Sequence, residues 1–185
     1  MTTRHRHTIN RIGAALNNIA QLGEPVLAEV ATYVRDFGPE LQQLVERMQT
    51  AMEDANGVGI AAPQIFESQR VMIIASRPSE RYPDAPHMEP LVLVNPEMLT
   101  HGSTKQLGWE GCLSVPGIRG RVCRFCDVGI AYQDLNGNSH SIQLSGFVAR
   151  IAQHELDHLD GKTFVDKVES RRDLIAGTVW EQQCR

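Results

Sequence analysis

The chain has 185 residues, which suits one domain with a sizeable hydrophobic core. Its formal net charge of -4 shows no basic excess, so extended or sequence-specific nucleic-acid binding is not expected. No apolar run approaches the length of a membrane span, and no secretory leader follows the first residues. We therefore expect a cytoplasmic protein with no membrane partner.

The N-terminal stretch is basic. Residues 1–23 contain Arg4, Arg6 and Arg11 and no acidic residue, which faintly resembles an organelle-targeting leader. We expect residues 1–18 to be a flexible basic extension, with an organellar location as the alternative to the bacterial cytoplasm. The chain has four cysteines, and without a secretory leader these favour free thiols over a disulfide framework.

Two helices are predicted in the first third of the chain. Residues 26–34 are expected to form a short helix that ends near residues 37–39. A second helix begins at Pro39, whose fixed φ suits a first helical turn, and ends at Asn56-Gly57. Its apolar residues recur at helical spacing and indicate an ordinary core face.

The segment Gly57-Val58-Gly59-Ile60-Ala61-Ala62-Pro63-Gln64 follows directly. Two glycines and two alanines leave room for a substrate backbone or another chain to approach closely. The segment lacks the pattern of a phosphate-binding loop. A tight turn into a strand explains the small residues equally well, and Gln64 would then be only a solvated polar residue.

Two short β-branched runs, at residues 71–75 and 91–94, predict strands, with a surface loop at 76–90 between them. Residues 127–133 and 139–144 alternate in polarity and are predicted to be paired strands, with Asn136-Gly137 in the connecting turn. A short strand at 164–165 and a helix at 171–180 complete the chain. The predicted fold class is α+β, with a central helix wrapped by small antiparallel β-sheets.

Cys112 lies in the glycine-rich stretch 108–117, where tightly turned backbone could present its side chain. A thiolate is a good ligand for a borderline divalent metal, although the residue alone is as consistent with a buried inert thiol. Cys123 and Cys126 have the spacing of half a structural zinc site. Because no second pair follows, we interpret them as small residues beside a strand.

The predicted central helix contains His154-Glu155-Leu156-Asp157-His158. Positions i and i+4 share a helix face, so the two imidazoles can bind one metal ion with Glu155 beside them as a proton carrier. Phe147 and Ile151 continue the histidine stripe, which therefore faces inward.

The opposite stripe of this helix is polar and predicts a solvent-facing side. It consists of Arg150, Gln153, Asp157 and Asp160. Ser145 and Gly161 are the expected caps of the helix.

A third ligand is needed, because catalytic metal sites normally have three protein ligands and an open position. Phe164 stands where one large protease class carries a third histidine, which excludes that class. Cys112 would complete the site, and Glu169 or Glu181 remain weaker options. The open alternatives are therefore a zinc endopeptidase and a non-catalytic, metal-stabilised binding module.

Three segments in this order resemble the signature motifs of peptide deformylases. They are Gly57–Gln64, Glu110-Gly111-Cys112-Leu113-Ser114 and His154–His158, and the similarity runs from about Ile19 to Lys167. That family removes the formyl group from the N-terminal methionine of new polypeptides. The resemblance implies a single catalytic domain over residues 1–185 with a deformylase-like fold.

The resemblance also implies the roles of individual residues. The implied metal ligands are Cys112, His154 and His158. The implied catalytic groups are Glu155, Gln64 and the backbone N–H of Leu113, the last two holding the oxygen of the tetrahedral intermediate. One divalent ion per chain is expected, Fe²⁺ natively with Zn²⁺, Ni²⁺ or Co²⁺ as substitutes.

The implied partner is a nascent peptide that begins with formylmethionine. Its extended backbone would pair with Gly57, Val58 and Gly59 on one side and with Gly111 on the other. Its methionine side chain would enter an apolar pocket lined by Phe147 and Ile151. The ribosome near its exit tunnel is a further candidate partner, on which the sequence itself is silent.

Overall fold

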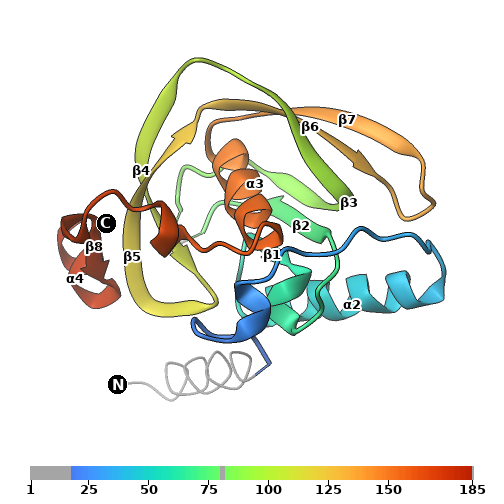
Figure 1. Ribbon diagram of the computed structural model, residues 1–185. Helices are drawn as coiled ribbons and strands as arrows, with labels where there is room; N and C mark the ends of the chain where they lie inside the picture. The colour runs from blue at the N-terminus through green and yellow to red at the C-terminus, as the bar shows by residue number, and fades with distance from the viewer. Residues whose placement is uncertain (1–17, 80–81, 185) are drawn as a thin grey trace.

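The computed structural model describes residues 18–79 and 82–184, so the predicted N-terminal extension lies outside the described residues except for Asn18. Helix α3, Gly146–Leu159, runs through the middle of the molecule between two antiparallel sheets (Figure 1). The α+β prediction with a central helix is confirmed. No helix of the described part of the chain is long and apolar enough to cross a membrane.

The larger sheet has the strand order β1-β2-β3-β6-β7. Its strands are Gly59–Ala61, Val71–Ser76, Met88–His101, Asp127–Gln133 and Ser139–Ser145, given in chain order. The long strand β3 pairs with β2 through its first half and with β6 through its second half. Between the halves Asn95 has φ +51, and its side chain binds the backbone N–H and carbonyl of Val34.

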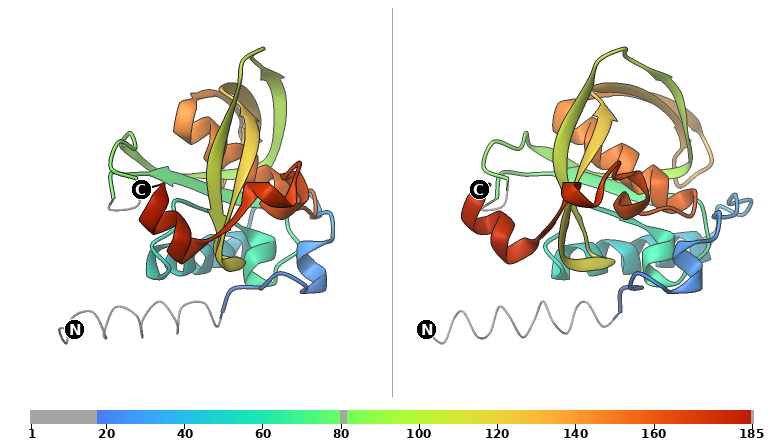
Figure 2. Two further views of the ribbon diagram at one scale, coloured as in Figure 1. Left: turned by 90° about the vertical axis from the view of Figure 1, so that its left-hand side faces the viewer. Right: turned by 60° about the vertical axis from the view of Figure 1, so that its left-hand side comes forward.

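The smaller sheet has the order β4-β5-β8, with strands Lys105–Cys112, Val115–Phe125 and Leu174–Ala176. Strands β4 and β5 form a hairpin whose last pair is Cys112 and Val115. The hairpin stands beside α3, on the opposite side of the helix from the larger sheet (Figure 2).

The apolar sequence of β2 is explained by burial on both faces. Met72 and Ile74 pack in the cluster that includes the apolar side of α3, while Val71 and Ile73 pack in the cluster under helix α2, Pro39–Asp54. A strand covered on both faces reads as a continuous hydrophobic run instead of an alternating one. Strand β2 therefore anchors α3 from one side and α2 from the other.

The prediction of a helix at residues 26–34 is wrong. Only Pro25–Leu27 form a 3₁₀ turn, and the chain then extends past the end of α3. The Ala31 N–H donates to the Leu159 carbonyl at 2.9 Å, and the Thr32 N–H donates to the Ser68 carbonyl at 3.0 Å. These backbone groups find partners far away in the chain, so helical hydrogen bonds are not needed to satisfy them.

The C-terminal predictions need two corrections. Residues 164–165 belong to a 3₁₀ turn, Phe164–Lys167, in which the Asp166 carboxylate accepts from the Thr163 N–H and the Phe164 ring is buried. Residues 171–180 do not form one helix. Strand β8 interrupts them because its backbone pairs with the free edge of β5, and only Gly177–Gln183 form helix α4.

The polar side of α3 does not face solvent as predicted. Gln153 is buried, and its amide exchanges two hydrogen bonds with the backbone of Phe125 in the smaller sheet. Arg150 and Asp157 are half-buried against the same sheet, and Asp160 alone of the four is exposed. The helix thus packs its apolar side on one sheet and binds the other sheet through polar side chains.

The caps of α3 lie at the predicted residues. Ser145 holds the N-cap position, but its side chain makes no capping hydrogen bond. Gly161 follows the helix with φ +69, the left-handed conformation that a glycine after a helix commonly adopts.

Candidate active site

Three predicted ligand residues meet at one point. Cys112 ends strand β4, and His154 and His158 project from successive turns of α3. Their ligand atoms all lie within 4.8 Å of one another, and Cys112 Sγ is 3.1 Å from His158 Nε2. Among the described residues, these three form a group whose donor atoms are close enough together to hold one metal ion.

The donor set fits a divalent ion of borderline softness. One sulfur and two imidazole nitrogens are ligands that iron, zinc, nickel and cobalt accept. The alternative third ligands, Glu169 and Glu181, are exposed and lie outside this group.

The environment of Glu155 also indicates that a bound group completes the site. Its Oε2 atom is fully buried and has no hydrogen-bond partner among the described protein atoms. Buried polar atoms rarely lack a partner, so a water molecule or ligand beside the three donor atoms is expected.

The electrostatics favour the ligating form of the thiol. Burial disfavours a charged Cys112, but the His158 charge and the hydrogen bonds of both histidines hold the pKa of the thiol well below its usual range. The thiolate is the form that binds metals. Burial likewise opposes a charged His154, while hydrogen bonds to Cys112 and Glu110 raise the pKa of the imidazole.

Glu110 orients one of the two imidazoles. Its Oε2 atom lies 3.0 Å from His154 Nδ1, which leaves the Nε2 atom of that ring for the metal position. Arg124 binds both carboxylate oxygens at 2.9 Å, and Arg150 binds Oε1 at 2.8 Å. Burial opposes the charge on Glu110, but the hydrogen bonds from His154 and Arg124 hold its pKa well below the ordinary value. The sequence motif contains Glu110, yet sequence reasoning gave it no role.

Glu155 lies beside the histidines, nearly buried, on the same helix. Burial raises the pKa of its carboxyl to about 7, against the opposing charges of His154 and His158. Gly59 of β1 packs directly on this carboxylate, because a Cβ atom there would come within 2.4 Å of Glu155 Oε1. The glycine therefore sets the position of the glutamate.

Gln64 is fixed inside the protein and is not the solvated residue that one interpretation allowed. Its side chain is 1% exposed, and its Oε1 atom accepts from the Ala61 N–H at 2.9 Å. Its Nε2 atom lies 3.5 Å from Cys112 Sγ and 3.2 Å from Ser114 Oγ. The amide donor group thus points toward Cys112, one of the three candidate metal ligands.

A cavity of about 270 Å³ opens next to this cluster. Its walls include all the residues predicted to bind substrate, together with Leu113: Gly57, Val58, Gly59, Gly111, Phe147 and Ile151. Strands β1 and β4, which flank the cavity, are both edge strands of their sheets. Sequence reasoning missed Tyr82, Trp109 and Arg119, which also line the cavity and lie outside any periodic pattern.

Two inward-facing imidazoles and a glutamate on one helix meet a thiol from a neighbouring strand beside a cleft. This arrangement defines a metal-dependent hydrolase. The family model of polypeptide deformylase matches residues 16–173, and the chain belongs to this family. Members of this family are metal-dependent hydrolases that remove the N-formyl group from nascent peptides.

The similar proteins agree with this assignment. Peptide deformylase 2 of Nostoc sp. is 47% identical over 165 residues, which cover 89% of this chain and 92% of that protein. The crystal structure of class I type b peptide deformylase from Acinetobacter baumannii with Met-Ala-Ser bound matches with a TM-score of 0.79 and 48% identity, over 81% of this chain and 96% of that one. The Thermotoga maritima enzyme matches with a TM-score of 0.74 and 34% identity, over 82% and 97% of the two chains.

Proposed function

We propose that this chain hydrolyses the N-formyl group of formylmethionine at the N-terminus of nascent polypeptides and releases formate. The observation that supports this most directly is the convergence of the Cys112, His154 and His158 donor atoms within 4.8 Å, beside Glu155 and an open cleft. A nascent substrate is consistent with action in the bacterial cytoplasm and near the ribosomal exit tunnel, and both remain part of the proposal.

Cys112, His154 and His158 are the proposed ligands of one divalent ion, Fe²⁺ natively, with Zn²⁺, Ni²⁺ or Co²⁺ as substitutes. When bound, the ion supplies Lewis-acid activation of water near neutral pH. A thiolate ligand also makes the site sensitive to oxidation, so the protein should be handled without oxygen.

Glu155 is the proposed proton carrier. Its carboxylate accepts a proton from water as the water oxygen bonds to the formyl carbon. When the carbon–nitrogen bond breaks, the same carboxyl group returns the proton to the leaving amine, so that formate and a free N-terminus result. Burial raises the pKa of this carboxyl, which favours a group that must first accept a proton and then release it.

Gln64 and Leu113 are the proposed oxyanion donors. The Gln64 side chain is held by Ala61 so that its amide N–H group points to the site, and Leu113 follows Cys112 in the turn of the β4-β5 hairpin. Preorganised hydrogen-bond donors stabilise the negative charge that develops on the formyl oxygen. Losing one such donor typically lowers the rate by about 10²–10³-fold.

The cleft suits an extended peptide with an apolar first side chain. The free edge of β1 carries Gly59, with Gly57 and Val58 just before it, and the edge of β4 carries Gly111 opposite. A peptide between these edges can add backbone hydrogen bonds to both sheets. Phe147 and Ile151 form the apolar wall on α3 that we assign to the methionine side chain.

The decisive experiment is formate release from formyl-Met-Ala-Ser by anaerobically prepared, Fe²⁺-loaded protein, with metal analysis of the same sample. Glu155→Ala should keep the metal and lose about 10²–10⁴-fold in kcat. Glu169→Ala, which changes an exposed glutamate, is the matched control and should stay active. A fully active Glu155→Ala variant would show that another group carries the proton.

The same preparation distinguishes the alternatives. An endopeptidase would cleave internal peptide bonds, and its Cys112→Ser variant would still bind the metal. A deformylase site should lose the metal when Cys112 is replaced by serine. A metal-stabilised binding module would contain metal and release no formate. Membership of the deformylase family does not favour the endopeptidase.

A further inference from the structure

Tyr82 reaches the cleft from the segment between β2 and β3 and bridges its two walls. Its ring centroid lies 4.7 Å from that of Phe147, in the first turn of α3. Its hydroxyl oxygen accepts a hydrogen bond of 3.1 Å from Arg119 Nη1 on β5. The Arg119 guanidinium is in turn 4.6 Å from the centre of the Trp180 ring in α4. Tyr82 thus connects the helical wall of the cleft to the wall formed by the smaller sheet.

The backbone of Tyr82 is fixed by local hydrogen bonds. Its N–H donates to the Ser79 carbonyl and lies 3.1 Å from Ser79 Oγ, while the Ser79 N–H donates back to the Tyr82 carbonyl at 3.1 Å. The Ala85 N–H also donates to the Tyr82 carbonyl, at 3.2 Å, and Ala85 is buried. These bonds fix the backbone from which the ring projects, and Phe147 and Arg119 contact the ring itself.

The ring stands at the far end of the face of α3 that leads away from the metal site. Phe147, Ile151 and His154 all line the cavity from this face. Phe147 precedes His154 by seven residues, or about 10 Å along a helix axis. A first side chain that runs from the reacting carbonyl along α3 therefore meets Phe147 and Tyr82 last.

A second cavity of about 250 Å³ lies beyond this pair. Tyr82, Trp109, Phe147 and Arg150 line both cavities. The residues that line only the second cavity belong mainly to β4, the end of β5 and the start of α3: Gln106, Leu107, Gly108, Arg124, Phe125 and Gly146. The rings of Tyr82 and Phe147, whose planes are inclined at 47°, are therefore part of a partition between two hollow spaces.

We propose that Tyr82 is a specificity-determining residue: its ring is the end wall of the pocket for the first side chain and limits that side chain to about the length of methionine. This inference depends on the proposed deformylase function. Without the Tyr82 ring the two cavities join, and longer or wider first side chains gain space. A pocket limit of this kind discriminates between substrates by roughly 10–200-fold for each misfitting group.

The test compares kcat/KM for formyl-Met-Ala-Ser with kcat/KM for formyl-Trp-Ala-Ser. Tyr82→Ala should raise the Trp/Met ratio at least about tenfold, chiefly through a lower KM for the tryptophan peptide. Tyr82→Phe keeps the ring and loses only the hydroxyl, so its ratio should stay at the wild-type value. Tyr82→Leu, which removes the ring but keeps an apolar side chain, should raise the ratio in the same direction and provides a second variant if Tyr82→Ala does not fold.

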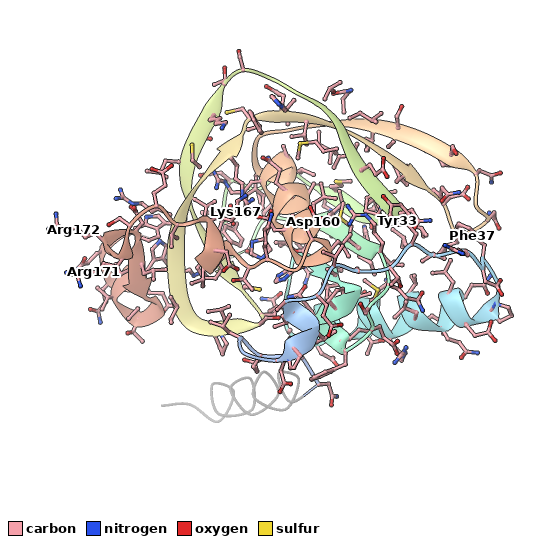
Figure 3. All side chains as sticks on the ribbon, in the orientation of Figure 1. Tyr33, Phe37, Asp160, Lys167, Arg171 and Arg172 are labelled. Atoms are coloured by element: carbon pink, nitrogen blue, oxygen red, sulfur yellow. The ribbon has the colours of Figure 1, made fainter. Side chains whose placement is uncertain are left out.

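Tyr33→Ala is the matched control. Tyr33 is an exposed tyrosine near Asp160 at the other end of α3 (Figure 3). Arg70 lies over its ring and pairs with Asp160. The Trp/Met ratio of the Tyr33→Ala variant should equal that of the wild type.

Two outcomes overturn the inference. One is a folded, active Tyr82→Ala or Tyr82→Leu variant with an unchanged Trp/Met ratio, and the other is an equal rise in the ratio for Tyr33→Ala. Failure of the wild-type protein to release formate from either peptide would instead overturn the proposed function.

Discussion

Glu110 contributes both of its carboxylate oxygens to a buried network that contains two arginines and the imidazole of His154. Removing one partner from such a network leaves charges buried without compensation, which is more costly than the pairing is favourable. The network also fixes the ring of a proposed metal ligand. Mutation of this carboxylate should therefore affect both stability and metal binding.

We expect Glu110→Gln to lower the free energy of unfolding by about 3 kcal/mol at pH 7 and the metal affinity by about 10–100-fold. The folded-state pKa of Glu110 is depressed. The contribution of its carboxylate to the free energy of unfolding is therefore complete above the ordinary glutamate pKa of about 4.3, and it is lost progressively as the pH falls from there toward the folded-state pKa. Urea denaturation at pH 7 and pH 3 should thus show a smaller difference between variant and wild type at pH 3. The exposed Glu169→Gln is the control, and an equal loss in both variants would contradict the prediction.

Gly59→Ala tests the contact that positions Glu155. The added Cβ would lie 2.4 Å from Glu155 Oε1 and 2.9 Å from Ile151 Cγ2, so the carboxylate must move. A displacement of about 1 Å at a catalytic group can cost 10²-fold in rate. We expect a loss of kcat of that order in formate release, with the metal retained.

Gly102→Ala is the matched control for this change, because its Cβ would meet only Asp127 at 3.5 Å, an ordinary contact. Gly59→Ala with wild-type kcat would mean that Glu155 can act from a shifted position.

At the scale of single elements, prediction from the sequence succeeded where burial of one face gives the element a regular pattern of apolar residues. Helix α2 begins at Pro39 as predicted, and its apolar stripe is buried against the larger sheet. Strands β6 and β7 also pair as predicted, with Asn136-Gly137 in their turn. Residues 26–34 failed because their hydrogen-bond partners lie in distant segments, which no local pattern encodes.

The polar stripe of α3 was misread for a related reason. Hydrophobic periodicity identifies the side that packs on apolar neighbours, but it does not distinguish water from a second polar partner. Gln153 satisfies the backbone of Phe125 instead of meeting solvent. A helix between two sheets can thus carry the sequence pattern of a surface helix.

The C-terminal end of α3 gives a prediction at this scale. Gly161 has φ +69, and a Cβ there would lie 2.7 Å from the Ala28 carbonyl oxygen. Left-handed backbone alone costs an L-residue about 1–2 kcal/mol, and the contact adds to this cost. Gly161→Ala should therefore destabilise the protein more than Gly146→Ala, which has φ +56 at the other end of α3 and no atom within 4 Å of its Cβ. Chemical denaturation of both variants measures the difference, and equal losses would show that the Ala28 contact has no effect.

At the scale of the whole molecule, the sequence identified the two histidines and Glu155 because one helix contains them. The place of Cys112 beside them depends on how the β4-β5 hairpin stands against α3, and helical spacing cannot report that arrangement. The resemblance to a family supplied this step. Tyr82 and Arg119 were missed because their contact joins a loop to a strand, and neither residue belongs to a recognisable pattern.

The proposed ion would join the smaller sheet to the central helix, because one ligand comes from β4 and two come from α3. A ligand that binds only the folded chain stabilises it by about 2.7 kcal/mol at a free concentration of 100 times its Kd. For a chain of this length, such a change shifts Tm by roughly 5–10 °C. Under anaerobic conditions we therefore expect Ni²⁺-loaded protein to melt higher than chelator-treated protein by about this interval.

Cys112→Ser should remove most of this metal-dependent shift, since it deletes the ligand that connects the two parts of the fold. Cys123→Ser is the matched control, because Cys123 is a free, exposed thiol on β5 and should leave the shift intact. Thermal unfolding of the three proteins with and without chelator measures the effect directly. A Cys112→Ser variant that responds to the chelator as the wild type does would show that the thiol does not bind the ion, and the assignment of the metal site would fail with it.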